Sequence, residues 1–356
     1  MLLLFALRPA QADSAAGSVF VRSDSNDTVV VSPRAALSKR LDDTQLDVAY
    51  AADVWTSASI DIVAAATRTV TEQRDEIDVG ATQEDVVDGL SLTGAYRYSI
   101  ENDYESHGAS GAVTWDLAMN NATLALSGGL YADTVGRSGA PQFSERLLTA
   151  TGRLAYTQVL DTKMLAQLTY EFGALRGYQA SPYRFVGIGG DGLGCQGAQL
   201  CLPEHLPEGR MRNAIAGRVR RALTDDISVD LNYRFYFDDW NMTSHTVAAQ
   251  VGWMASEDLL ISLRYRFYLQ SAANFYQRLY AIMPNPGAYL TRDRELSQMN
   301  DHRVGLEVSQ RVPLGSNDAS LVLSANVGGT LIAYDAFVGL DQVRALDGTL
   351  VIGVEQ

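Results

Sequence analysis

The sequence lacks any continuous hydrophobic run of the roughly 18 to 20 residues that a transmembrane helix needs. It is also nearly free of lysine: Lys39 and Lys163 are the only lysines among 28 basic residues, and the formal net charge is −14. Proteins that bind the phosphate backbone of nucleic acids need a basic surface. These two absences exclude a helical membrane protein and argue against nucleic acid as a partner.

Cysteine is scarce as well. The two cysteines, Cys195 and Cys201, lie six positions apart in the glycine-rich stretch GIGGDGLGCQGAQLC. A small loop closed by a disulfide fits this spacing and implies an oxidising compartment. A structural zinc site needs paired clusters of ligands, and His205 is the one imidazole nearby. We therefore expect a Cys195–Cys201 disulfide, with no metal and no cofactor.

The first twelve residues resemble a truncated signal peptide. Met1 to Leu7 form an apolar run, and Ala10 to Ala12 read AQA, which has the small-x-small form of a signal-peptidase site. The run is short and has no basic residues before it, so a misplaced start codon is the alternative. The expected organisation is a truncated signal peptide over residues 1–12, followed by one domain over 13–356.

Helical periodicity is almost absent, and alternation of apolar with polar residues replaces it. In LNYRFYFDDW, Leu231, Tyr233 and Phe235 fall on one side of an extended chain, while Arg234 and Asp238 fall on the other. The same alternation between turns predicts sixteen strands: 18–24, 28–39, 44–57, 74–86, 90–102, 107–119, 122–133, 145–159, 163–178, 210–222, 227–237, 242–255, 259–275, 301–312, 319–333 and 345–355.

Loop length separates two folds that this pattern allows, a soluble sandwich or solenoid and an outer-membrane barrel. Short polar turns such as VDG and LDTK alternate along the chain with longer connections at 58–73, 134–144, 179–209 and 276–300. Up-and-down barrels of the bacterial outer membrane carry short periplasmic turns at one end and longer extracellular loops at the other. The sequence therefore predicts an all-β, up-and-down antiparallel transmembrane barrel of about 16 strands.

In such a barrel the aromatic and aliphatic side chains face lipid and the charged ones face the lumen. The candidate lumen-lining residues are Arg97, Glu101, Asp116, Arg153, Glu171, Arg218, Arg220, Asp230, Arg234, Arg264, Arg266, Glu307 and Arg311. A soluble core does not hold so many ionised groups, because each unpaired buried charge costs several kcal/mol. Two interpretations of the arginines stay open: a ladder of Arg234, Arg264 and Arg266 along a path for anions, or salt bridges that stiffen the wall.

A rim hydrolase is a lesser alternative. Asp238, Asp239 and His245 lie around one predicted loop, and His107 and His302 also fall near strand ends. An aspartate and a histidine together activate water. No nucleophile with a recognisable partner spacing accompanies them, so we expect a protein that is not an enzyme and assign no catalytic residue.

Several stretches resemble an outer-membrane barrel family catalogued as domain-of-unknown-function family 3570. The most specific are YRFYFDDW at 233–240 and YRFYLQSAANFY at 265–276, and DVWTSASIDIV at 53–63 is a looser match. The resemblance covers about residue 19 to the end of the chain. It implies an outer-membrane β-barrel and no established activity, and it points to the motif residues Asp53, Asp238, Asp239, Trp240, Gln270, Ser271, Phe275 and Tyr276. The family's gene neighbours imply extracytoplasmic redox work.

We therefore expect a barrel in a Gram-negative outer membrane, in contact with outer-membrane lipid, that forms a conduit or porin-like pore. Sixteen strands are wide enough to enclose an aqueous channel. The main alternative is a non-conducting scaffold or sheath for a redox or secretion partner, such as a periplasmic redox protein or lipoprotein. The sequence names neither the solute nor the oligomeric state.

Overall fold

The computed structural model describes residues 13–57, 70–195, 197–315 and 319–356. The signal-like segment 1–12 lies outside the described residues. Within the described chain, no helix is both long and apolar enough to span a membrane.

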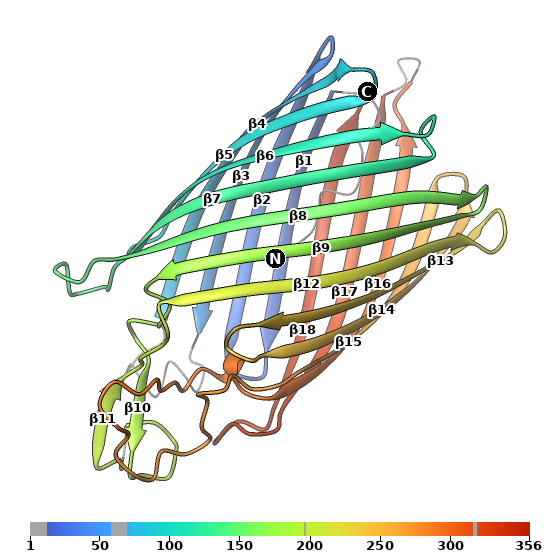
Figure 1. Ribbon diagram of the computed structural model, residues 1–356. Coiled ribbons are helices and arrows are strands. Elements are labelled where there is room, and N and C mark those ends of the chain that lie inside the picture. The colour runs from blue at the N-terminus through green and yellow to red at the C-terminus, as the bar shows by residue number, and fades with distance from the viewer. Residues whose placement is uncertain (1–12, 58–69, 196, 316–318) are drawn as a thin grey trace.

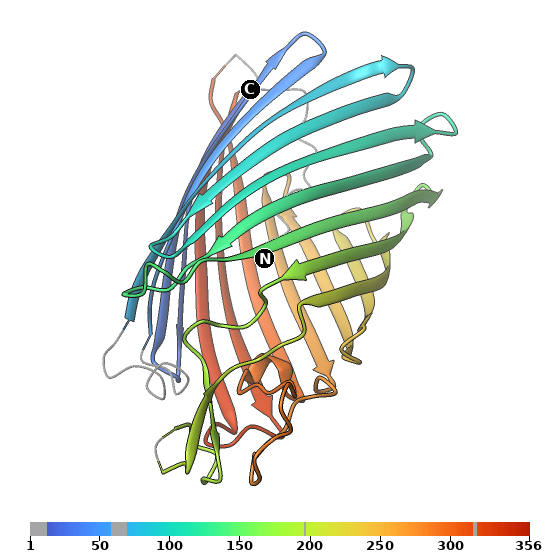
Figure 2. The same ribbon diagram turned by 60° about the vertical axis from the view of Figure 1, so that its left-hand side comes forward.

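Sixteen antiparallel strands close into a single barrel (Figures 1 and 2). The first strand, β1, pairs with β2 on one side and with the last strand, β18, on the other. The barrel strands are β1 (Ser14–Asp24), β2 (Thr28–Leu41), β3 (Thr44–Ser57), β4 (Val70–Val87), β5 (Leu90–Ile100), β6 (Tyr104–Leu117), β7 (Ala122–Val135), β8 (Glu145–Asp161), β9 (Met164–Gly177), β12 (Gly209–Ala222), β13 (Ile227–Asp238), β14 (Thr243–Ser256), β15 (Leu259–Gln270), β16 (Met299–Pro313), β17 (Ser320–Tyr334) and β18 (Gln342–Glu355). The predicted fold class is confirmed.

The strand boundaries agree with the sequence prediction to within a few residues, with two kinds of exception. The strand predicted at 259–275 ends at Gln270, because the chain after it turns away to form a loop. The connection between β9 and β12 was expected to be a loop throughout, yet it contains a two-stranded hairpin, β10 (Phe185–Ile188) and β11 (Leu200–Pro203). Strands of four residues are too short to show alternation.

The long connections gather at one end of the barrel, together with short turns at 25–27, 101–103 and 239–242, and the opposite end carries short turns. The tight turns after β2, β4 and β8 lie at the end where the C-terminus is labelled in Figure 1. Asp42 and Gly89 adopt the positive φ angles, 53° and 72°, that tight hairpin turns require. The long connections at 178–208 and 271–298 lie together at the other end, below the barrel in Figure 1. The predicted segregation of loop length is confirmed.

The two faces of the wall differ as expected for a barrel in lipid. On the outer face of β15, Leu263 is 54% exposed and Tyr265 is 43% exposed. Arg264 and Arg266, which alternate with them, point inward to ion-pair partners. The same alternation runs through β2, where exposed and half-buried residues alternate along the whole strand. Such an extended exposed apolar surface is stable only in contact with lipid.

Because one face of the wall meets lipid and the other meets the lumen, the same substitution should have unequal effects on stability at adjacent positions of β14. Val251 is 45% exposed on the outer face, and Gln250 lies on the lumen face between Asp230 and Arg264. We expect Val251→Arg to destabilise the folded barrel by about 2–4 kcal/mol, the cost of an arginine near the middle of a bilayer. Gln250→Arg, the matched control, should change stability by less than about 1 kcal/mol. Urea unfolding in lipid vesicles measures both, and equal losses would contradict the assignment of faces.

Candidate functional site

The lumen wall is built from paired charges. Each arginine of the proposed anion ladder has a carboxylate partner: Arg234 bonds Glu171 at 2.8 Å, Arg266 bonds Asp301 at 2.8 Å, and Arg264 bonds Glu307. These three arginines therefore fit the interpretation in which salt bridges stiffen the wall. Because their charge is compensated, the ladder does not form a continuous path of free positive charge.

Several of the other candidate lumen residues also have polar partners. Arg218 and Arg220 share Asp230 at 2.6 and 3.0 Å, Arg97 bonds Asp78 at 2.7 Å, Arg311 bonds Glu355 at 3.0 Å, and Asp116 accepts a hydrogen bond from Thr123 at 2.8 Å. The side chains of Arg220 and Arg311 remain 50% and 57% exposed. Charged groups this accessible inside a closed wall require a hydrated lumen.

Acidic and basic side chains are unevenly distributed around this lumen, although each sector also holds ion-paired groups of the other sign. Carboxylates predominate on the inner face of β3 to β7: Asp47, Asp53, Glu72, Glu76, Asp78, Glu84, Glu101, Asp116 and Asp133. Guanidinium groups predominate on the inner face of β8 to β16: Arg153, Arg210, Arg212, Arg218, Arg220, Arg234, Arg264, Arg266, Arg303 and Arg311. The separation places an electric field across the lumen, perpendicular to its axis.

Three connections pack together as a cap at the long-loop end. The cap consists of segments 178–208, 271–298 and 335–341. Isolated bridges join Ile188 to Tyr280 and His205 to Leu290, and Val186 packs in the same buried cluster. Cys195 and Cys201 form a disulfide across the loop between β10 and β11. The cap therefore has its own small core outside the barrel.

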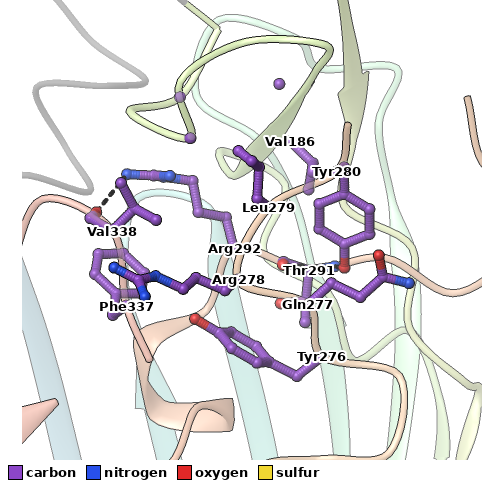
Figure 3. Close-up of a pocket in the computed structure, with 13 residues that line it drawn as sticks. Val186, Tyr276, Gln277, Arg278, Leu279, Tyr280, Thr291, Arg292, Phe337 and Val338 are labelled. Carbon is purple, nitrogen blue, oxygen red and sulfur yellow. Dashed lines mark hydrogen bonds between the residues drawn. The ribbon is translucent and has the colours of Figure 1, made fainter. Parts of the chain in front are cut away.

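Figure 3 shows a crevice inside this cap, between Val186, Tyr280, Arg292 and Phe337. Arg292 lies over the Phe337 ring at 5.0 Å and donates a hydrogen bond to the Val338 carbonyl at 3.3 Å. The cavity volume is about 10 Å³, which is the space of about one water molecule. The crevice holds the cap loops together and is too small for a solute.

Asp238 fixes the turn between β13 and β14, and Trp240 and Met242 of this turn pack against Leu206, Ala273 and Leu296 of the cap. The Asp238 carboxylate accepts hydrogen bonds from Arg210 at 2.9 Å, from the Tyr236 hydroxyl at 2.7 Å, and from the backbone amides of Trp240 and Met242 at 3.0 and 2.9 Å. The Arg210 guanidinium lies 4.1 Å from the centre of the Trp240 ring. The side chain of Asp238 is fully buried, so this ion pair replaces water for both partners.

The second family motif supplies the matching anchor. Gln270 is buried and donates to the carbonyls of Glu295 and Ser297 at 2.7 Å each, which ties β15 to the short 3₁₀ helix η1 (Arg294–Leu296). Phe275 stacks edge-on against Trp240 at 5.2 Å, and the Tyr276 hydroxyl bonds the Ala336 carbonyl at 3.0 Å. Gln270, Phe275 and Tyr276 therefore hold the loops of the cap in place.

The remaining motif residues have local roles. Ser271 accepts a hydrogen bond from the Thr243 amide at 2.9 Å, and Asp239 accepts one from the Met211 amide at 3.0 Å. Asp53 lies on the inner face of β3 and pairs with Arg74. Sequence reasoning missed Arg210 and Arg212, although both continue the inward alternation of Arg218 and Arg220 on β12.

Glu204 is the buried carboxylate of the cap. It bonds Arg184 at 3.2 Å, the Ser181 amide at 3.0 Å, and the Thr291 hydroxyl. Burial raises the pKa of Glu204 above its ordinary value, and the nearby Arg184 and the two hydrogen bonds offset this only in part. Ionisation of Glu204 is thus less favourable in the folded cap than in water.

The histidines of the rim face outward and bind tyrosines. His107, His245 and His302 each bond a tyrosine hydroxyl of the preceding barrel strand through Nδ1: Tyr96 at 2.6 Å, Tyr233 at 2.8 Å and Tyr265 at 2.9 Å. Each imidazole also packs beside the next outward aromatic ring, Tyr98, Phe235 or Phe267. Asp238 and Asp239 are engaged elsewhere, so the structure does not assemble the Asp/His pair considered for a hydrolase.

Three carboxylates near the ends of β4 and β5 lie close together. Oxygens of Glu72, Glu101 and Asp103 are within 4.8 Å of one another. Such a group offers the hard oxygen ligands that Ca²⁺ or Mg²⁺ prefers. The carboxylates alone do not define a metal site, and we assign none.

The family model described as protein of unknown function, DUF3570, matches residues 65–151 and 141–323. The chain belongs to this family. The match includes both motif stretches that build the anchors of the cap. No curated protein matches the chain.

Solved structures with the same architecture are outer-membrane proteins. A bacterial polysaccharide outer membrane secretin is 9% identical, with 95% of this chain and 97% of that chain covered and a TM-score of 0.51. CdiB from Acinetobacter baumannii is 11% identical, with 96% and 60% covered and a TM-score of 0.51. At this identity the likeness shows the fold alone: an outer-membrane β-barrel.

The anchor predicts a sharp difference between two adjacent aspartates. Asp238→Asn leaves the largely buried Arg210 without its counter-charge, and breaking such a pair costs about 3–5 kcal/mol. Asp239→Asn removes the charge of an exposed carboxylate and should cost less than about 1 kcal/mol. We expect trypsin to cleave the cap of the Asp238 variant much faster, while heat-modifiable migration in gels shows that the barrel has folded. Equal cleavage of both variants would disprove the anchor.

The raised pKa of Glu204 predicts that the cap becomes more stable on acidification. A carboxylate whose pKa is higher when folded than when unfolded stabilises the folded form at low pH, and this contribution is lost as the pH rises through the folded pKa. Protease protection of the cap should therefore increase as the pH falls from neutral toward the ordinary glutamate value of 4.5. Glu204→Gln should flatten this dependence, whereas Glu208→Gln, at an exposed position of the same segment, should leave it unchanged.

Proposed function

We propose that the protein is a conduit of the outer membrane, a porin-like pore for small hydrophilic solutes. The observation that carries the proposal is the hydrated, charged lumen of a closed barrel of 16 strands. A barrel with only a structural role can fill its interior with packed side chains, and here arginines and carboxylates stay partly exposed to water.

The distribution of charge supports a pore for polar molecules. The carboxylates of β3 to β7 face the guanidinium groups of β8 to β16 across the lumen. A dipolar solute aligns in such a field and exchanges part of its hydration for wall contacts. The ion pairs hold the side chains of the wall in place, because a charge that moved away from its partner would lose its counter-charge.

The cap defines the orientation that we propose. Long connections lie on the extracellular side of outer-membrane barrels, so the cap faces outward and the tight turns face the periplasm. Its fastening through Asp238 and Gln270 holds it over one sector of the mouth, next to β12–β15. Solutes would enter beside the cap.

A conduit predicts a measurable current. Purified protein in planar bilayers should give stable open-channel conductance, and Asp230→Asn should shift the reversal potential toward anion selectivity, because Arg218 and Arg220 lose the carboxylate they share. Arg221→Gln, on the outer face of the same strand, is the control and should leave selectivity unchanged.

A silent barrel would contradict this function. If that barrel copurified from native membranes with a periplasmic redox protein or lipoprotein, the scaffold hypothesis would replace the pore. Hydrolysis of lipid or peptide substrates by the purified barrel would instead support the rim hydrolase.

A further inference from the structure

A cavity of about 460 Å³ lies inside the barrel mouth, directly under the cap. Arginines 210, 212 and 234 and tyrosines 236 and 268 line its barrel side, from strands β12, β13 and β15. Leu206 and Leu296 of the cap line its other side, together with Trp240 and Met242 of the β13–β14 turn. A cavity of this size is in the range that holds small organic ligands.

Arg212 is the group in this cavity that lacks a counter-charge. Its Nε atom is buried and has no hydrogen-bond partner, and no carboxylate of the described chain forms an ion pair with its guanidinium. Arg212 also lies two residues from Arg210 on the same face of β12, so two positive charges are adjacent. A buried unsatisfied donor of this kind is costly unless a ligand or water binds it.

The nearby carboxylates are already engaged. Asp238 pairs with Arg210, and Glu171 pairs with Arg234. Asp293 pairs with Arg184 in the cap, 3.0 Å away, and caps η1, and the other acidic lining residue, Glu295, is exposed. No ion pair links Arg212 to these carboxylates in the described part of the chain.

A second arginine lies outside the lining of the cavity, beside Glu171, which is the ion-pair partner of the lining residue Arg234. Arg153 lies directly opposite Glu171 in the register of β8 and β9, and its Nε is likewise buried without a partner. Two arginines with unsatisfied donors therefore flank the Arg234–Glu171 pair. The local balance of charge favours an anion.

The rest of the lining decides which kind of anion. Leu147, Leu175, Leu206 and Leu296 offer apolar surface, and Trp240 offers an aromatic ring. We propose that this cavity binds a small organic monocarboxylate with an apolar body, whose carboxylate bonds Arg212 and whose body packs against the leucines and Trp240. As a selective step in transport the site rests on the proposed conduit, but binding itself does not require conduction.

Calorimetric titration of the detergent-solubilised full chain with benzoate tests the site. We expect saturable binding to the wild type, and a dissociation constant at least about tenfold higher for Arg212→Gln, since a hydrogen-bonded charge contributes a factor of this order. The neutral isostere benzamide should bind at least about tenfold more weakly than benzoate. Arg220→Gln is the matched control, because Arg220 lies on the same face of β12, roughly 26 Å along the strand, outside the cavity.

Absence of saturable benzoate binding, equal binding of benzamide, or unchanged binding by Arg212→Gln would each overturn the proposal. If Arg212→Gln fails to fold, Arg212→Lys decides, because it keeps the charge and loses the planar fork of donors. Binding weakened at least about threefold supports the site, and unchanged binding refutes it. Bilayer conductance separates the two proposals: a conducting barrel that binds no benzoate refutes the site alone, and a silent barrel that binds benzoate refutes the pore alone.

Discussion

The pairing of β1 with β18 is the constraint on which the structure depends. Hydrocarbon offers no partner for an unpaired backbone N–H or C=O group, so a sheet in a membrane has to close. Once it is closed, side chains with a period of two face either lipid or lumen. Apolar residues such as Leu263 face the lipid, and charged residues such as Arg264 face the lumen.

The lumen and the cap use charge in different ways. Along the wall, arginines and carboxylates pair while keeping contact with water, so each pair contributes order to the side chains more than stability. At the base of the cap, Asp238 and Arg210 are removed from water and the pair is completed by backbone amides. Arg212 belongs to neither arrangement, although it lies between them in sequence and space.

Much of the fold could be predicted because it depends on local alternation and on the lengths of connections. The list of lumen candidates rests on the same alternation: a residue's face follows from the parity of its position, as for Arg234 and Glu171. Partners could not be predicted in this way. The bond between Arg234 on β13 and Glu171 on β9 depends on how side chains reach across an intervening strand. The hairpin of the cap could not be predicted, because β10 and β11 are too short to show alternation. The anchoring roles of Asp238 and Gln270 could not be predicted either, because they depend on loops that come together only in the folded structure.

The outward-facing histidines distinguish the two surfaces of the wall by the type of side chain that each surface carries. His107, His245 and His302 all lie on the lipid side of the wall, and the described lumen carries its positive charge on arginine. Two kinds of nitrogen group therefore mark the two faces of the wall: imidazoles that bond tyrosine hydroxyls on the outside, and guanidinium groups that pair with carboxylates on the inside.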